Sequence, residues 1–412
     1  MEHGNGISWT FYDSFELLAD LDQEWDAFVE KVGGEVFLSF DWQKLWWKYY
    51  GRNRELRIFV FRRNTEIVGV LPCFFESFRF GPFETRAVKL VGSDYSITSF
   101  TIPIQAEHLK EVISIAVMEM KKHWNFDLLL IGPVSGYACE KHRSAFISAF
   151  RSVDSFRLFY DSSQVQTYFT ICDNLEKQIS SLSKKEKKRM RRMYKQLTAS
   201  GKETVSDSAS RNDCLIMFDK FVKMHQEHWN SSGKSGHFGA WPSAYQFHKE
   251  LVESQSKRNR LRLLEIRIND RTVAYKYSYR FGIFYHAFLD SKIPYDHKHI
   301  SLYRLGFGEL CKVASSENAR YIDSLRGFYE HKMHMGGFTL PIYNFYLQER
   351  RISSSIKAFL LRAVSTLYDL LYYKILRVRI LHKSRIGKHL LSEFWIRTKG
   401  FSFSLKIGKT KG

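Results

Sequence analysis

Hydrophobic and polar positions follow the same order twice along the chain. In the first half the strands RIFVFRR (57–63) and EIVGVLPCFF (66–75) are joined by a polar turn at Asn64-Thr65, which predicts a β-hairpin. In the second half the strands LRLLEIRI (261–268) and TVAYKYSYRF (272–281) flank another polar turn. A third strand, a helix and a further strand follow each hairpin. This repetition predicts two α/β domains of similar layout.

The same periodicity predicts the remaining elements of both halves. Apolar residues recur every three to four positions in the helical segments and every second position in the strands. Ser39 and Ser301 are in position to cap the helices that follow them. We therefore expect strands at 87–91, 126–131, 283–289 and 321–325, and helices at 41–50, 109–122, 141–150, 182–197, 212–229, 243–255 and 301–314.

A further amphipathic helix is predicted over residues 352–381, where Arg362 and Lys374 lie among apolar residues at helical spacing. The C-terminal part of the chain also carries much of the positive net charge. The protein has 63 Lys and Arg against 43 Asp and Glu, a net charge of +20, and residues 350–412 contain 15 basic and 2 acidic residues. Three interpretations stay open for this tail: a helix packed on the protein's own core, contact with an anionic membrane surface, and nucleic-acid binding.

A second basic block lies at residues 184–195, inside the predicted helix 182–197. It is typical of a solvated helix face, of an electropositive rim for a phosphate-bearing ligand, or of a nucleic-acid-binding arm. The chain has no RNA-recognition motif or zinc-finger pattern. We therefore do not expect nucleic acid as a partner.

Cysteine usage and the chain start narrow the class of protein further. The five cysteines lie far apart and form no CxxC motif, which argues against a disulfide framework and against a thiolate zinc site. The first residues lack the basic and apolar regions of a signal peptide. No uncharged apolar run of 18 residues occurs, so we expect no spanning helix. These features predict a cytoplasmic protein, with peripheral contact with the cytoplasmic membrane face left open.

Short motifs in both halves resemble the GNAT acyltransferase superfamily. In the first half these are FLSFDWQKLWWKYYG (37–51), Val70-Leu71-Pro72, and Leu90-Val91-Gly92 before Asp94-Tyr95. In the second half they are the basic helix ending near Gly201, His225 with Trp229, Gly236, Phe238, Phe247-His248, and DSLRGFYEHK (323–332). Their order and spacing over residues 35–335 resemble, more narrowly, the double-domain branch associated with cellulose and exopolysaccharide biosynthesis.

The resemblance implies an α/β (α+β) fold of tandem GNAT-like domains. Each domain is expected to have a mixed central sheet flanked by helices, and a basic helical C-terminal tail is expected after them. The boundaries that we predict are 1–165 for the N-terminal GNAT-like domain, 166–345 for the acyltransferase domain and 346–412 for the amphipathic tail.

The resemblance also implies a co-substrate, acetyl-CoA or another acyl-CoA. In this family the acyl-CoA binds where two parallel strands separate, and its pyrophosphate lies at the start of the next helix. Here that strand is 283–289 and the loop is 291–301, with Lys298, His299, Ile300 and Ser301 as the expected contacts. The family usually has a small residue or Gly before the helix, and this chain departs from that pattern.

Acyl transfer to an amine or hydroxyl needs a group that accepts a proton from the acceptor. Following the resemblance, the candidates on or after the separated strand are His286 and Asp290, with Asp323 and Glu330 near the end of the domain. Each also has a structural alternative: His286 as a core histidine, Asp290 as a turn residue, and Asp323 as a partner of Arg326.

Aromatic and charged residues are further candidates for substrate binding, because aromatic platforms with carboxylates suit sugar rings. The HxxH spacing of His225 and His228 has no third ligand at a fitting spacing, so we predict no metal. The predicted substrate contacts are Asp41, Trp42, Asp94 and Tyr95 in the first domain and His225, Trp229, Arg326 and Lys332 in the second. Each of these residues also suits ordinary packing.

Three functions remain in competition. The first is an acyl-CoA-dependent N- or O-acyltransferase that acts on an amino sugar or a polysaccharide or cell-envelope precursor, supplied as a small molecule or a lipid-linked glycan. The second is a Fem-type peptidyltransferase that uses aminoacyl-tRNA. The third is a catalytically degenerate scaffold in polysaccharide biosynthesis.

Overall fold

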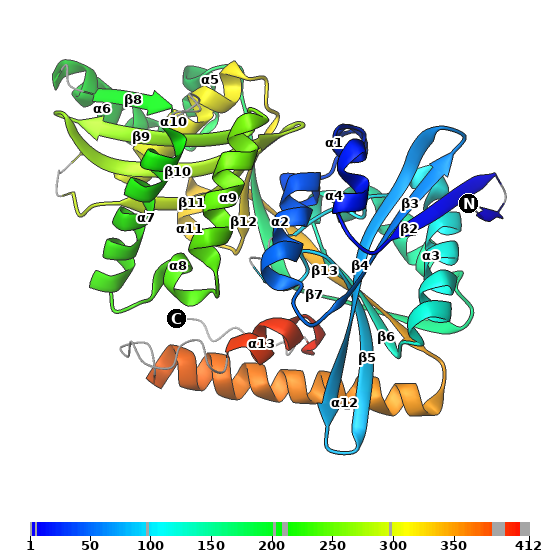
Figure 1. Ribbon diagram of the computed structural model, residues 1–412. Helices are drawn as coiled ribbons and strands as arrows, with labels where there is room; N and C mark the ends of the chain where they lie inside the picture. The colour runs from blue at the N-terminus through cyan, green and yellow to red at the C-terminus, as the bar shows by residue number, and fades with distance from the viewer. Residues whose placement is uncertain are drawn as a thin grey trace. The chain divides into compact units, whose positions relative to one another are not determined.

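The computed structural model describes residues 2–4, 6–95, 99–200, 203–207, 213–295, 299–380 and 392–403. The chain forms two compact units, shown in Figure 1: Met1–Val165 with Pro341–Gly412, and Gln166–Leu340. The residues from 341 onward thus belong to the first unit, whereas the sequence pattern set the segment after 345 apart as a tail.

The first unit is built on a mixed sheet in the order β1-β2-β3-β4-β5-β6-β13. Neighbouring strands are antiparallel except β5 and β6, which are parallel over Ala87–Lys89 and Leu128–Leu130. The strands are β1 (Glu2–Gly4), β2 (Ile7–Tyr12), β3 (Glu55–Arg63), β4 (Glu66–Phe80), β5 (Phe83–Leu90), β6 (Leu128–Val134) and β13 (Phe338–Glu349), the last of which enters from the second unit.

Helices cover this sheet, and the C-terminal ones share its core. Ala358, Leu361 and Phe401 are buried with Ala87 and Leu128 of the strands. The α-helices are α1 (Asp22–Lys31), α2 (Phe40–Tyr50), α3 (Leu109–Trp124), α4 (Gly136–Arg151), α12 (Ile352–Tyr368) and α13 (Ser392–Thr398). Short 3-10 turns are η1 (Glu16–Leu21), η2 (Val36–Leu38), η3 (Ala106–His108) and η6 (Lys399–Phe401), and α12 continues as the π-helix η4 (Asp369–Ile380).

The second unit has a sheet in the order β7-β12-β11-β10-β9-β8. Only β11 and β12 are parallel neighbours in it. The strands are β7 (Phe156–Thr170), which begins in the first unit, β8 (Glu203–Asp207), β9 (Leu261–Ile268), β10 (Arg271–Phe281), β11 (Phe284–Lys292) and β12 (Tyr321–Arg326).

The helices of the second unit lie on both faces of its sheet. Alternate residues of β10 point to opposite faces: Tyr277 contacts Phe221 of α7, and Lys276 lies against Gly306 of α10. The helices are α5 (Leu175–Ser181), α6 (Lys184–Ser200) and α10 (Leu302–Ser316) on one face, α7 (Cys214–Ser231), α8 (Gly236–Ala240) and α9 (Ala244–Lys257) on the other, and the short α11 (Glu330–His334) after β12.

The predicted elements are confirmed, with ends that shift by a few residues. Ser301 caps α10, since its hydroxyl accepts a hydrogen bond from the Arg304 amide at 3.5 Å. Ser39 precedes α2, but its side chain makes no capping hydrogen bond, so that prediction is wrong in its mechanism. The sequence pattern missed the strands β1, β2, β7, β8 and β13 and the helices α1, α5, α8 and α11.

Candidate functional site

The parallel strands β11 and β12 separate partway along their length. Their register runs through three pairs and ends at His286↔Asp323. Beyond this point β12 bulges against β7 between Asp323 and Arg326, and Leu325 has a φ of 58°. Strand β11 continues to Lys292. The end of the parallel register therefore marks where the two strands part, within the strand pair that the sequence predicted.

His286 and Asp323 join the two strands at that point. The His286 Nδ1 donates to Asp323 Oδ2 at 3.0 Å, and Gln166 of β7 donates to the same oxygen at 2.8 Å. The other carboxylate oxygen accepts from the Leu325 amide at 2.9 Å. Both side chains are almost fully buried. Because Asp323 binds groups from three positions, it fixes the geometry of the separated strands.

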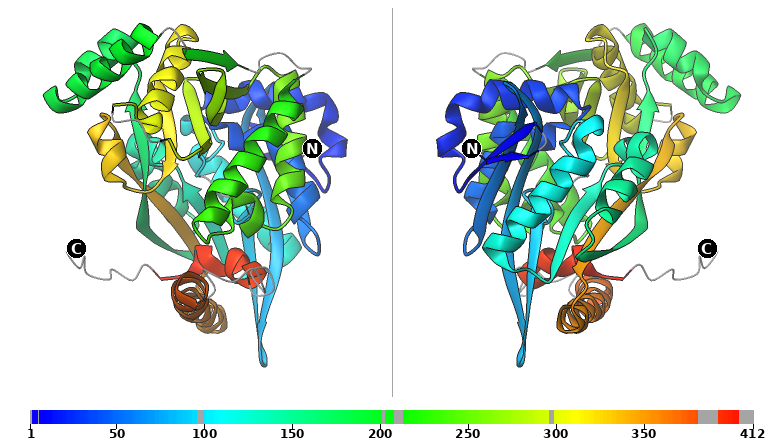
Figure 2. Two further views of the ribbon diagram at one scale, coloured as in Figure 1. Left: turned by 90° about the vertical axis from the view of Figure 1, so that its left-hand side faces the viewer. Right: turned by 90° about the vertical axis from the view of Figure 1, so that its right-hand side faces the viewer.

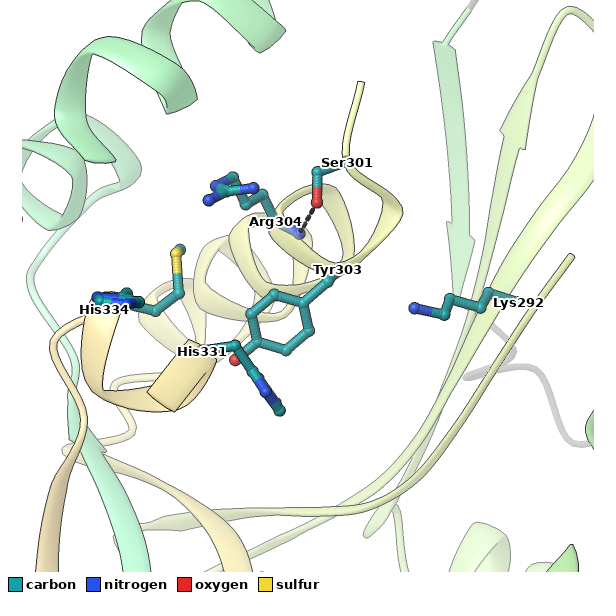
Figure 3. Close-up of a pocket in the computed structure, with 7 residues that line it drawn as sticks. Lys292, Ser301, Tyr303, Arg304, His331 and His334 are labelled. Carbon is teal, nitrogen blue, oxygen red and sulfur yellow. Dashed lines mark hydrogen bonds between the residues drawn. The ribbon is translucent and has the colours of Figure 1, made fainter. Parts of the chain in front are cut away.

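A pocket of about 350 Å³ opens at the start of α10. Figure 3 shows Lys292 pointing from the end of β11 toward Tyr303 of α10 and His331 of α11. A helix start presents unpaired amide groups and partial positive charge, and four of the lining side chains are basic. The pocket is therefore suited to an anion. Its lining residues are Lys292, Ser301, Tyr303, Arg304, His331, His334 and Met335.

The basic helix α6 supports one side of this pocket. Glu186 is buried and accepts from Arg304 Nε at 2.8 Å. Arg192 donates to His299 Nε2 at 2.7 Å. The other face of α6 contributes Met190 to the hydrophobic core of this unit. Most lysine and arginine side chains of α6 are exposed, and none of them is among the residues that line the pocket, so the three interpretations of the basic block stay predictions.

Asp290 lies beside the same pocket. Its carboxylate accepts from Lys276 Nζ at 2.6 Å and its side chain is 51% exposed. The Asp290 charge acts on two pocket residues. Burial raises the pKa of Tyr303 and Asp290 raises it further, whereas burial and neighbouring lysines lower the pKa of His331 and Asp290 opposes them. Asp290 is thus a solvent-accessible carboxylate near the pocket.

The segment after β12 contributes three more predicted residues. Lys332 Nζ donates to the Ser324 carbonyl at 2.7 Å, and burial lowers its pKa. Burial also lowers the pKa of Arg326, to about 10. Glu330 is exposed at the start of α11, next to His331. The structure therefore brings Lys332 to the bulge of β12 and leaves Glu330 in solvent.

His225 holds the end of β11 from the other face of the sheet. Its Nδ1 donates to the Asp290 carbonyl at 3.0 Å, while its Nε2 accepts from the His237 amide at 3.3 Å. This pattern requires neutral imidazole, and burial lowers the pKa of His225 accordingly. Trp229, one turn later, is partly exposed and lies under Lys234. Within the described residues no group of three or more His, Cys, Asp or Glu could hold a metal ion.

The predicted substrate residues of the first unit are mostly buried. Asp94 pairs with Arg54 at 2.9 Å and with Lys89 at 2.8 Å. Burial raises the pKa of Asp94, but the two cations outweigh it and hold the pKa well below its usual range. Tyr95 stacks on Tyr50, and Trp42 is buried against Phe37, while Asp41 is partly exposed. Their role as substrate contacts stays a prediction.

The predicted phosphate loop divides into different environments. Lys298 lies outside the described residues. Ile300 belongs to the hydrophobic core, His299 pairs with Arg192, and Ser301 both caps α10 and lines the pocket. The sequence analysis missed Lys292, Tyr303, Arg304, His331, His334 and Met335. The available signals were Arg304, three positions after the helix cap, Lys292 inside the predicted loop 291–301, and His331 inside the motif 323–332.

Comparison with known proteins agrees with this geometry. Residues 184–333 match the family model described as acetyltransferase (GNAT) domain. No curated protein matches the sequence. Among solved structures, the crystal structure of FemX is similar in fold, with a TM-score of 0.57 and 13% identity over 85% of this chain and 98% of that one.

A conserved protein of unknown function from Bacteroides thetaiotaomicron VPI-5482 has a TM-score of 0.50 and 11% identity, over 83% of this chain and 100% of that one. At these identities the likeness shows the fold alone. The family match covers α6 to α11, which includes the separated strands and the pocket. Residues 184–333, within the second unit, are therefore similar to acetyltransferase (GNAT) domains, which are domains of transferase enzymes.

Proposed function

We propose that the protein transfers an acyl group from an acyl-CoA to an amine or hydroxyl acceptor. The observation that carries this proposal is the basic pocket at the start of α10, beside the point where β11 and β12 part, inside the GNAT domain. Lys292, Arg304 and the α10 amides would hold the phosphates. When bound, the acyl-CoA supplies an activated thioester.

Asp290 is the group that we assign to proton transfer. It is half exposed beside the pocket, whereas His286 is buried with its Nδ1 bound to Asp323. The Asp290 carboxylate takes the proton that the acceptor loses, and the acceptor attacks the thioester carbonyl while the thiolate leaves. Lys276, at 2.6 Å from Asp290, keeps this carboxylate oriented.

The acceptor that we propose is an amino sugar or a polysaccharide or cell-envelope precursor, either a small molecule or a lipid-linked glycan. The sequence motifs that resemble the exopolysaccharide branch support it. The fold likeness to FemX and the basic helix α6 favour a second candidate, a Fem-type transferase that takes its acyl group from an aminoacyl-tRNA.

Calorimetric titration of acetyl-CoA and CoA into the protein tests the donor. Lys292→Ala removes one pocket cation and is expected to weaken binding about tenfold, which corresponds to about 1.4 kcal/mol. Lys257→Ala is the matched control, because Lys257 lies on α9 and pairs with Glu253. Absence of binding at millimolar CoA would contradict the acyl-CoA proposal. Transfer that depends on aminoacyl-tRNA would then establish the second candidate.

Kinetics of Asp290→Asn test the proton acceptor. A positioned base contributes roughly 10²- to 10⁴-fold to rate, so we expect kcat to fall by about 100-fold or more. The affinity for acetyl-CoA should stay within about threefold, because the basic residues of the pocket remain in place. An unchanged kcat would exclude Asp290 as the base and would direct attention to Glu330, which is exposed beside the pocket.

A further inference from the structure

The outer face of α12 and of its continuation η4 exposes large apolar side chains. Ile352 is 81% exposed, Phe359 61% and Leu367 55%. Figure 2 views this helix nearly along its axis. Exposed apolar residues are common singly, but a continuous row of them marks an interaction surface. The exposed members of this row, here called the outer stripe, are Ile352, Ile356, Phe359, Leu367, Leu370, Leu371 and Ile375.

The opposite face of α12 carries much smaller side chains. Ser354, Ala358, Leu361 and Ser365 are buried against the first unit. Ser354 makes hydrogen bonds of 2.7 Å to Asp127 and 2.8 Å to Glu349. A helix on a globular protein ordinarily turns its large apolar side chains inward. In α12 this order is reversed, so packing on the protein's own core does not account for the outer stripe.

Helical spacing makes the outer stripe one surface. Ile352, Ile356, Phe359 and Leu367 are separated by four, three and eight positions, which places them on the same side of an α-helix. Ala363 fills the turn between the last two. The π-helical residues that follow carry the exposed apolar character on to Ile375. The stripe therefore extends over both α12 and most of η4.

Basic residues accompany the outer stripe. Arg351, directly before Ile352, is 67% exposed, and Lys374 is 41% exposed between Tyr373 and Ile375. In the sequence, residues 376–391 contain five Lys or Arg and no Asp or Glu. An anionic lipid bilayer has negatively charged headgroups over an apolar acyl layer. Basic side chains next to an apolar helix face complement both layers.

We propose that the outer stripe binds the surface of an anionic membrane, with α12 lying in the plane of the lipid headgroups. The described helices include none that is long and apolar enough to cross a bilayer. Long basic side chains beside the stripe reach the lipid phosphates while their carbon stems cover apolar surface. This inference is independent of the acyl-transfer chemistry.

Flotation with lipid vesicles tests the proposal. The full-length protein is mixed with vesicles of phosphatidylcholine alone or with 30% phosphatidylglycerol, at about 0.1 M and about 0.5 M NaCl, which bracket strong and weak charge screening. We expect binding to the anionic vesicles that weakens at high salt. Ile356→Ser/Leu367→Ser should lower the bound fraction about tenfold, because both side chains would enter the interface.

Leu17→Ser/Ile216→Ser is the matched control, because both residues are exposed to a similar extent but lie on η1 and α7. It should bind vesicles as the unaltered protein does. Equal thermal melting and equal acetyl-CoA titrations would show that each variant is folded and that its donor site is unaffected. Vesicle binding that Ile356→Ser/Leu367→Ser leaves unchanged would overturn the proposal, as would absence of binding to anionic vesicles. A dimer that this variant dissociates would assign the stripe to a second copy instead.

Discussion

At the residue scale, the buried His248 and the half-buried His237 of the second unit form a hydrogen bond that depends on their protonation. His237 Nε2 lies 3.1 Å from His248 Nε2, and His248 Nδ1 lies 3.3 Å from the Tyr277 hydroxyl. One ring must donate and the other accept, so the contact cannot persist when both imidazoles carry a charge. Burial lowers the pKa of His237 to about 3 and also lowers the pKa of His248 well below its usual value.

Acid should therefore weaken this unit. In the unfolded chain both histidines bind a proton below about pH 6.5, whereas in the folded protein they stay neutral to lower pH. The free energy of unfolding is therefore at its full value above this pH and decreases as the pH falls toward 3. His237→Gln should reduce the pH slope of the unfolding free energy by about 1.4 kcal/mol per pH unit in this window. Urea unfolding at pH 4, 5, 6 and 7 measures this slope.

His334→Gln, at an exposed position of α11, serves as the control for this measurement. It should leave the pH slope close to that of the unaltered protein. If both variants show the same slope, the His237–His248 contact does not govern acid stability.

At the element scale, α10 approaches its neighbours closely through two glycines. A Cβ on Gly306 would lie 2.3 Å from Lys276 Cε, and one on Gly308 would lie 2.1 Å from the Tyr194 hydroxyl oxygen. Tyr194 in turn donates to Glu309 at 2.9 Å. These glycines let α10 lie against β10 on one side and α6 on the other.

Gly308→Ala should destabilise the second unit although alanine favours helices. The helix gains about 1 kcal/mol, but the rigid Tyr194 ring must move, and overpacking of this kind costs about 1–3 kcal/mol. Denaturant unfolding measures the balance. Adding Tyr194→Phe to Gly308→Ala removes the closest atom and should restore part of the loss. If Gly308→Ala alone stabilises the protein, then α6 and Tyr194 move aside for the added methyl group without cost.

Helices and strands with a clear period were predictable, and those without it were not. The strands of both hairpins alternate or run apolar, and they were found. Strand β7 contains the polar run DSSQ in its centre, and β13 contains Pro341, so neither shows a strand pattern. Their pairing partners, not their own composition, place them in the sheet.

The candidate site was predictable in its scaffold and not in its lining. The Ser301 cap follows from local sequence, whereas the separation of the strands was expected from the family resemblance. The pocket side chains Lys292, Arg304 and His331 come from β11, α10 and α11, and only the fold brings these positions together. The choice of Asp290 rather than His286 as the proton acceptor likewise depends on the exposure of the two side chains. Sequence spacing does not predict this exposure.

At the scale of the whole chain, a buried ion network ties the last helix to the centre of the first unit. Glu76 of β4 binds Arg54, Lys89 and Arg397 of α13, and Asp94 binds Arg54 and Lys89. Arg397 Nε donates to Glu76 Oε2 at 3.0 Å across more than 300 residues of sequence. Three cations thus share two buried anions, while the exposed Glu393 lies 3.8 Å from Arg397, and four of the five side chains of the buried network are almost fully buried.

This imbalance predicts unequal effects for the two ends of one ion pair. Glu76→Gln leaves three cations with a single anion, and an uncompensated buried charge costs about 3–5 kcal/mol. Arg397→Gln leaves two cations with two anions and removes a side chain that is 28% exposed, so about 1 kcal/mol is expected. Urea unfolding followed by tryptophan fluorescence reports on this unit, because every tryptophan except Trp229 and Trp241 belongs to it. Equal losses for the two variants would show that solvent, rather than the count of charges, sets the energy of the network.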